Sequence, residues 1–127
     1  MKRAMNILLV VCAGVAGQLL SAQTQPSGDA ARGKEIFERR CTGCHTLDQN
    51  REGPMLRNVF GRTAGSVKDF EYSEALKKSQ LVWDEQTLEK WLSNPDEFVP
   101  GNNMGFRIAK PQERQDLIRF LRAGAQK

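Results

Sequence analysis

Cys41-Thr42-Gly43-Cys44-His45 is the stretch that decides the fold of this 127-residue chain. Two cysteines separated by two residues, with a histidine directly after the second, form the attachment pattern of a c-type haem. Each thiol can add to one vinyl group of the same porphyrin, which holds the adjoining histidine beneath the iron. The pattern therefore predicts one covalent haem c per chain, tethered by Cys41 and Cys44, with His45 as an axial iron ligand.

The two cysteines also allow three other interpretations. A thioredoxin-like redox pair usually accompanies a βαβ unit, and the sequence shows no strand alternation. A closed zinc site needs four ligands, whereas the chain has three cysteines and one histidine, and Cys12 lies in a segment that we expect to be removed. A disulfide across two residues would be strained and would leave the histidine without a role. We favour haem attachment.

The first 22 residues have the features of a secretory signal peptide. Lys2 and Arg3 form a charged start, residues 7–20 are mostly apolar, and Leu20-Ser21-Ala22 is a suitable cleavage site. The apolar run falls short of the roughly 20 residues that a spanning helix needs, and an uncleaved anchor is the second interpretation. We therefore divide the chain into three regions: a signal peptide (1–22), a flexible leader (23–28) and one domain (29–127).

Length and charge agree with a small exported domain. Cleavage after Ala22 would leave 105 residues and lower the formal net charge from +4 to about +2. A domain of this size folds alone but has a modest core, to which a buried cofactor would add. The nearly balanced charge argues against nucleic acid, which needs a strongly basic face. Because c-type haem is attached outside the cytoplasmic membrane, we expect a periplasmic location.

Capping residues and apolar periodicity predict an all-α domain. Asp29, Ser73 and Asp84 are suitable N-cap residues, and Pro111 suits the first position of a helix. The helices after the three caps are predicted to end near residues 40, 78 and 93, the last of them at Asn94-Pro95, and the final helix covers about 111–122. Residues 46–65 and 98–104 are predicted loops.

Methionine is the predicted second axial ligand, because His45 is the only histidine in the chain. Met1 and Met5 lie in the signal, and Met55 is close in sequence to His45, which leaves Met104. Histidine and methionine together raise the reduction potential relative to harder ligand pairs. With both axial positions filled, no site is open for a substrate, which favours an electron carrier over an enzyme.

Three more residues are candidates for the surroundings of the haem. The carbonyl of Pro54 can accept a hydrogen bond from His45 and so fix the orientation of the ligating ring. Arg62 can pair with a haem propionate. The indole N–H of Trp83 needs an acceptor when buried, and a propionate would provide one.

Together these features resemble class I cytochrome c, most closely its mitochondrial-like soluble bacterial type. The resemblance extends from Gly28 to about Arg122. Its markers are Gly33 and Phe37, Cys41–His45, Gly53-Pro54, Phe60-Gly61-Arg62, Tyr72, Trp83, Asn94-Pro95, Pro100–Met104 and Asp116–Leu121. It implies the small cytochrome c fold, in which the N- and C-terminal helices cross, with Gly33 near Leu117, around a covalently bound haem.

The resemblance also implies roles for residues that the motifs alone do not assign. Tyr72 would join Arg62 and Trp83 around a propionate. Phe106 would cover the ring beside Met104.

The sequence departs from the family pattern near the haem and at its edge. Trp91 stands where the family usually has a tyrosine near the methionine, and Leu76 stands where it often has an asparagine. Asn102 replaces a common threonine. Asp96 and Glu97 stand where mitochondrial proteins have lysines, which predicts weaker docking to mitochondrial-type partners.

The predicted function is that of a soluble, monomeric periplasmic electron carrier. It would move single electrons between a respiratory or photosynthetic quinol-oxidising complex, or a dehydrogenase, and an oxidase, a reductase or a reaction centre. Its partners would be membrane electron-transfer complexes or periplasmic redox enzymes, docking transiently at the haem edge. The alternative is a haem sensor or peroxidase-like enzyme in which Met104 dissociates, and carbon monoxide binding to the reduced protein would distinguish the two.

Overall fold

The computed structural model describes residues 28–124, so the predicted signal peptide lies outside the described residues. Five helices occur in this range: α1 (Ala30–Arg40), α2 (Glu74–Ser79), α3 (Glu85–Ser93), α4 (Pro95–Phe98) and α5 (Pro111–Gly124). Residues 28–124 contain no strand, and Thr63 and Val82 form one isolated antiparallel bridge. The all-α class is confirmed. None of these helices is long and apolar enough to cross a membrane.

Capping side chains explain where the helices begin. Asp29 and Ser73 accept backbone N–H groups from the first turns of α1 and α2. Asp84 and Thr87 form a reciprocal capping box at α3, in which each side chain accepts the other residue's backbone N–H at 2.8 Å. Pro111 begins α5, where its missing N–H leaves no donor unsatisfied. These helix starts agree with the sequence prediction.

Two helix boundaries differ from the prediction. Pro95 follows the end of α3 as expected, but it also begins the one-turn helix α4, which includes Phe98 of the predicted loop. Proline is pre-organised for a first helical position, and Pro95 is buried, so packing retains this turn. Helix α5 continues through Gly124, two residues beyond its predicted end near residue 122, because glycine can adopt the helical conformation as readily as a terminating one.

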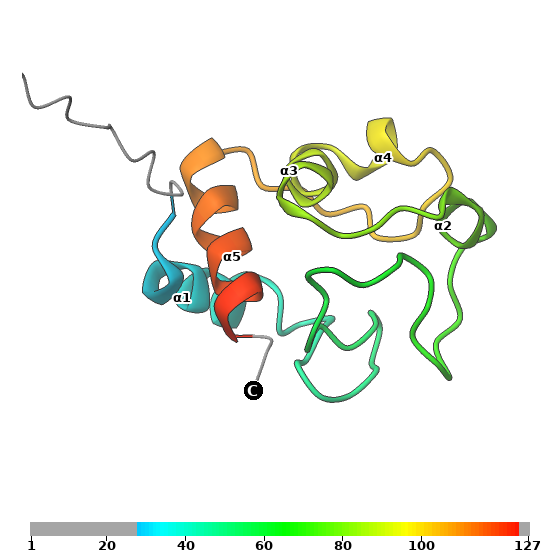
Figure 1. Ribbon diagram of the computed structural model, residues 1–127, viewed down its shortest axis with the longest axis horizontal. Coiled ribbons are helices and arrows are strands. Elements are labelled where there is room, and N and C mark those ends of the chain that lie inside the picture. Colours follow the sequence, from blue (N-terminus) through cyan, green and yellow to red (C-terminus); the bar gives the residue numbers. More distant parts are fainter. Residues whose placement is uncertain (1–27, 125–127) are drawn as a thin grey trace, which may run out of the picture.

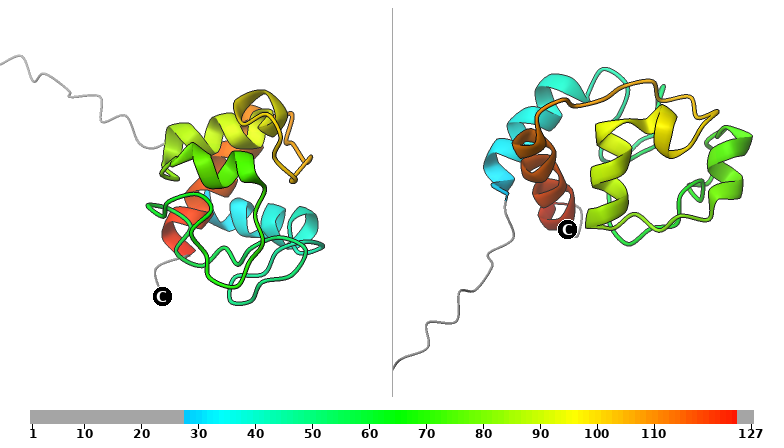
Figure 2. Two further views of the ribbon diagram at one scale, coloured as in Figure 1. Left: turned by 90° about the vertical axis from the view of Figure 1, so that its right-hand side faces the viewer. Right: turned by 90° about the horizontal axis from the view of Figure 1, so that it is seen from above.

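Helices α1 and α5 cross at close range on one side of the molecule (Figures 1 and 2). Gly33 allows the α1 backbone to approach the carbonyl of Asp116. The rings of Phe37 and Phe120 pack beside this contact with centroids 5.4 Å apart, and Leu117 is only 1% exposed. The predicted helix crossing is therefore confirmed.

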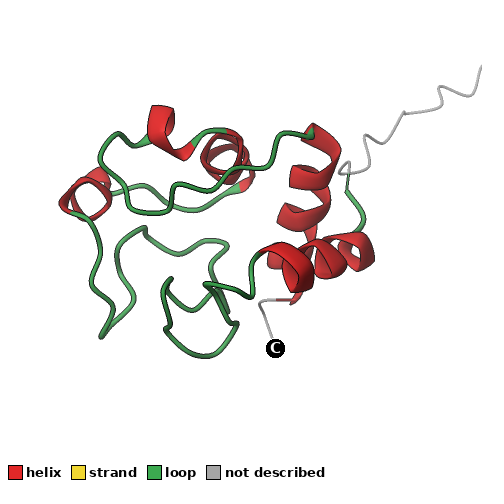
Figure 3. Ribbon diagram, turned by 180° about the vertical axis from the view of Figure 1, so that it is seen from behind, coloured by secondary structure: helices red, strands yellow, loops and turns green. Residues whose placement is uncertain are grey.

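The rest of the chain forms two walls beside the helix pair. Helices α2, α3 and α4 lie on one side, and the long loops of residues 41–73 lie on the other, as the labels and colours of Figure 1 and the loops of Figure 3 show. The walls are joined where Trp83 N–H donates to the Arg62 carbonyl at 2.9 Å and Ala64 N–H donates to the Leu81 carbonyl at 2.7 Å. Ile108, which is fully buried, contributes to the core from the segment that leads into α5.

Candidate haem site

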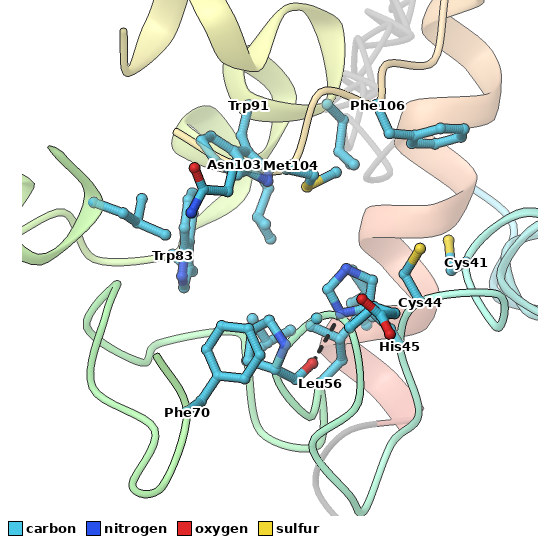
Figure 4. Close-up of a pocket in the computed structure, with 18 of the residues that line it drawn as sticks. Cys41, Cys44, His45, Leu56, Phe70, Trp83, Trp91, Asn103, Met104 and Phe106 are labelled. Atoms are coloured by element: carbon cyan, nitrogen blue, oxygen red, sulfur yellow. Dashed lines mark hydrogen bonds between the residues drawn. The ribbon is translucent and has the colours of Figure 1, made fainter. Parts of the chain in front are cut away.

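A cavity of about 430 Å³ lies between the two walls (Figure 4). Every predicted site residue lines it: Cys41, Cys44, His45, Pro54, Arg62, Tyr72, Trp83, Met104 and Phe106. Most of the remaining lining is apolar: Phe37, Leu56, Val59, Phe70, Leu76, Leu88, Trp91, Leu92, Leu117 and Leu121. The fold thus gathers residues from the whole described chain around one apolar space.

The attachment motif follows directly from the end of α1. Cys41 is the C-cap residue and donates its N–H to the Phe37 carbonyl at 2.9 Å. The His45 N–H in turn donates to the Cys41 carbonyl at 2.8 Å. This turn leaves Cys41 half-buried and Cys44 exposed at the cavity edge, with both thiols free. Burial raises the pKa of the Cys41 thiol to about 11.

Two of the alternative interpretations, a disulfide and a zinc site, can be compared with the described residues. The thiols are not joined as a disulfide. Within residues 28–124, no three His, Cys, Asp or Glu side chains are grouped so that they could hold a metal ion. The single imidazole and two thiols are instead arranged along one cavity.

His45 is held in one orientation by its neighbours. Its Nδ1 donates to the carbonyl oxygen of Pro54 at 2.8 Å, the hydrogen bond dashed in Figure 4. Because a carbonyl can only accept, Nδ1 carries the proton and Nε2 keeps its lone pair for a metal. Burial lowers the pKa of His45 and so favours the neutral ring. The hydrogen bond to Pro54 acts in the opposite direction, but its effect is smaller. A Cβ at Gly53 would lie 2.3 Å from Cε1 of His45, so only glycine fits there.

Met104 lies across the cavity from His45, on the opposite wall (Figure 4). Its backbone N–H donates to the side-chain oxygen of Asn102 at 2.8 Å. Gly101 and Gly105 flank this piece of chain with φ angles of +87° and +60°, which side chains rarely tolerate. Met55, the other methionine of the described chain, does not line the cavity.

Polar groups mark another part of the wall. The half-buried guanidinium of Arg62 donates to the carbonyls of Arg57 at 3.0 Å and Met55 at 2.8 Å. Burial lowers the pKa of Arg62, opposed by the nearby Tyr72. Burial likewise raises the pKa of Tyr72, and Trp83 lines the cavity with them. A half-buried cation beside a phenol and an indole can receive a carboxylate.

Sequence reasoning missed what Arg40 does at the cavity edge. Its Nη1 donates to Oε2 of Glu113 at 2.7 Å, and its guanidinium carbon lies 5.4 Å from the centre of the Phe106 ring. Arg40 thus ties the end of α1 to the start of α5 and to the segment beside Met104. No sequence signal marks this cluster, because its members are distant along the chain and charge–ring contacts have no characteristic spacing.

The cytochrome c family model matches residues 30–125. The chain belongs to this family. Cytochrome c from Chlamydomonas reinhardtii is 43% identical over 101 residues, which cover 76% of this chain and 90% of the relative. Cytochrome c 2.1 from Caenorhabditis elegans is 41% identical over 99 residues, covering 76% and 89%. The structure of cytochrome cH from Methylobacterium extorquens is 41% identical with a TM-score of 0.71, covering 75% of this chain and 98% of that one.

This cytochrome c therefore has the class I fold, carries covalently attached haem c with its iron, and is an electron-transfer protein rather than an enzyme. The cavity fits that group. Cys41 and Cys44 match the attachment motif at its edge, one imidazole offers a free Nε2, and the walls are apolar. Arg62 supplies a half-buried positive charge for a group that carries carboxylates.

Proposed function

We propose that this cytochrome c is an exported, soluble and monomeric carrier of single electrons in the periplasm. Its donor would be a respiratory or photosynthetic quinol-oxidising complex, or a dehydrogenase. Its acceptor would be an oxidase, a reductase or a reaction centre. The observation that carries the proposal is that His45 and Met104 occupy opposite walls of the cavity.

The proposed axial ligands explain why the protein carries electrons without transforming a substrate. Haem c, when bound, supplies an iron that gains and loses one electron. His45 and Met104 would both bind the iron of the haem from opposite walls of the cavity, which would leave no position on it for a substrate. The thioether of Met104 is a soft ligand that favours the ferrous state and raises the potential.

Other residues hold the group and keep water out. Cys41 and Cys44 form the thioether links, and the Pro54 carbonyl keeps the Nδ1 proton of His45 in place. Arg62, Tyr72 and Trp83 are proposed to surround a haem propionate. Phe106 is proposed to cover the porphyrin ring beside Met104.

Export rests on the N-terminal sequence. Lys2 and Arg3, the apolar stretch after them and the small residue Ala22 predict recognition and cleavage by the secretory machinery. The intact mass of the protein purified from its native membrane fraction and periplasm tests this. A chain that begins at Gln23 supports a cleaved signal, whereas a chain that keeps residues 1–22 indicates the uncleaved anchor.

The charges at the cavity mouth indicate how partners dock. Glu52 and Glu71 line the cavity and form no ion pair among the described residues. Arg40 also lines it and forms an ion pair with Glu113 at 2.7 Å, a carboxylate that it shares with Lys110. We propose transient docking at this mixed edge, which differs from a uniformly basic one and steers a different partner.

The visible spectrum of the exported protein tests the proposed ligation. A sharp c-type reduced spectrum, with the far-red sulfur-to-iron charge-transfer band in the oxidised state, is the expected result. Covalent haem without that band would reject Met104 as the ligand. Ready binding of carbon monoxide by the reduced protein at neutral pH would contradict the proposed function as an electron carrier. Monomeric mass by light scattering is the matching test of the oligomeric state.

A further inference from the structure

The side-chain amide of Asn102 makes three hydrogen bonds, all of them around Met104 and the helix before it. Its Oδ1 accepts the backbone N–H of Met104 at 2.8 Å. Its Nδ2 donates to the Val99 carbonyl at 3.0 Å and to Oδ1 of Asp96 at 3.1 Å. One side chain thus connects Asp96 within α4, the C-cap residue Val99 and Met104, the residue proposed as the iron ligand.

The partners of Asn102 require this orientation of its amide. The Met104 N–H can only donate, and the Val99 carbonyl and the Asp96 carboxylate can only accept. Turning the amide over would break all three bonds at once. The Asp96 carboxylate strengthens the arrangement, because a hydrogen bond to a charged acceptor is stronger than one between neutral groups.

The chain around Met104 has few other restraints. Gly101 and Gly105 flank it, and glycine loses more conformational freedom on ordering than any other residue. One further backbone bond, from Asn102 N–H to the Val99 carbonyl at 3.2 Å, closes the turn before it. Holding Met104 against the cavity therefore depends strongly on the Asn102 amide.

We propose that Asn102 is a positioning residue that keeps Met104 in its ligating position, and that Asp96 orients the Asn102 amide for this task. The inference rests on the proposed ligation by Met104. A hydroxyl side chain has a single proton to donate, so it could not satisfy Val99 and Asp96 together. Asn102 and Asp96 therefore act as a pair.

The test is the affinity of the ferric, haem-loaded protein for imidazole, which competes with methionine for iron. Loss of the sulfur-to-iron band on titration measures it. Asn102→Ala removes all three bonds, and we expect roughly tenfold tighter imidazole binding. Asn102→Asp keeps the acceptor for Met104 but places two carboxylates together, and we expect a similar gain. Asp96→Ala should give a smaller gain in the same direction, since Asp96 holds only the amide.

Glu97→Gln is the matched control, because Glu97 is the neighbouring acid on α4 and contacts Asn94 rather than Asn102. Its imidazole affinity should stay within about twofold of the wild type. Should Asn102→Ala fail to retain haem, Asn102→Thr keeps an acceptor and is expected to give an intermediate affinity.

The outcomes separate this inference from the ligation itself. A wild type without the charge-transfer band would reject ligation by Met104 and the role of Asn102 with it. A wild type with the band, combined with unchanged imidazole affinity in both Asn102→Ala and Asn102→Asp, would overturn only the positioning role. Equal gains in imidazole affinity in Asn102→Ala and Glu97→Gln would also overturn the positioning role, since they would reflect a general loosening of the chain between α4 and Met104.

Discussion

A Cβ atom at Gly33 would lie 2.0 Å from the carbonyl oxygen of Asp116, so α1 and α5 cross with no room for a side chain between them. The obstacle is backbone, which cannot turn aside as a flexible side chain would. Because α1 ends in Cys41 and α5 places Leu117 on the cavity wall, the spacing of these helices also sets the position of the haem site.

Gly33→Ala should destabilise the protein, although alanine favours helix more than glycine does. Pushing the crossing apart is expected to lower the free energy of unfolding by roughly 1–3 kcal/mol. Thermal and denaturant unfolding of the haem-loaded protein measures this. Gly43→Ala is the control, because a Cβ there meets nothing within 4 Å. Equal stability of the wild type and Gly33→Ala would mean that the crossing is looser than the distance indicates.

Asp116 should stabilise the fold in a pH-dependent way. The residue is 2% exposed, and burial acts to raise its pKa. Hydrogen bonds from the Asp29 N–H at 2.8 Å, Arg32 Nε at 3.1 Å and Gln112 Nε2 at 3.0 Å outweigh this, so the pKa of Asp116 lies below its ordinary value. The stabilisation is therefore present above the unfolded pKa of about 3.9 and is lost as pH falls through the folded one.

Asp116→Asn is expected to lower the free energy of unfolding at neutral pH by roughly 1–3 kcal/mol. The difference from the wild type should begin to shrink as pH falls below the unfolded pKa of about 3.9 and should be lost only below the lower folded pKa, where both states of the wild-type group are protonated. Denaturant unfolding at several pH values measures it. Asp69→Asn, at an exposed position, should change little. A difference that is constant with pH would show that the charge of Asp116 is not involved.

Met104→Ala should keep covalent haem but abolish the sulfur-to-iron charge-transfer band. The thioethers at Cys41 and Cys44 are independent of the axial thioether, so the haem stays attached while one axial position opens. Absorption spectra of the oxidised protein measure this, with Met55→Ala as the control expected to keep the band. Retention of the band in Met104→Ala together with its loss in Met55→Ala would show that Met55, and not Met104, is the sulfur ligand.

Gly53→Ala should disturb the proximal imidazole. The new Cβ would stand 2.3 Å from Cε1 and 2.6 Å from Nδ1 of His45, so the ring has to move and its hydrogen bond to Pro54 is broken. We expect a lower yield of low-spin haem protein and a changed reduction potential. Pro54→Ala keeps the carbonyl and should retain both properties. If the two variants behave alike, the glycine is not what places His45.

Reversing charge at the docking edge should change partner preference. Glu71→Lys with Glu97→Lys replaces two negative charges with two positive ones without changing either residue of the Asp96–Asn102 bond. Association with a partner that has an acidic docking face should become faster at low salt, and added salt should reduce the gain. Stopped-flow electron transfer measures the rate. Unchanged rates at low ionic strength would place Glu71 and Glu97 outside the docking face.

Local chemistry made much of the fold predictable. Asp29, Ser73 and Asp84 mark helix starts because their short side chains satisfy N–H groups that a helix leaves open. Helix α4 was not predicted, because Pro95 indicates the end of one helix and the start of another equally well. Burial of Pro95 against the core, which no local pattern reveals, decides that a further turn forms.

The roles of Arg40 and Asn102 show where sequence reasoning stops. No motif in the sequence singles out Arg40, and Asn102 stands out only as a replacement for a common threonine. Their partners, Phe106 and Asp96 respectively, are specified by how the segments fold back on one another. Arg40 contacts residues far along the chain and Asn102 contacts residues only two to six positions away, but neither kind of side-chain contact has a characteristic spacing in the sequence.

The sequence by itself determined the chemistry: two thiols and an imidazole in one tight turn, a single histidine, and one methionine in a glycine-flanked loop. Covalent spacing and side-chain type are local properties, so they can be read without coordinates. Only the tertiary structure decided that Met104 faces His45 across an apolar cavity, that Gly33 sets the distance between α1 and α5, and that an amide holds the methionine segment. The first two relationships join segments far apart in the chain, whereas the amide bonds residues two to six positions away. In each case steric exclusion and hydrogen-bond geometry in the folded chain select a single arrangement.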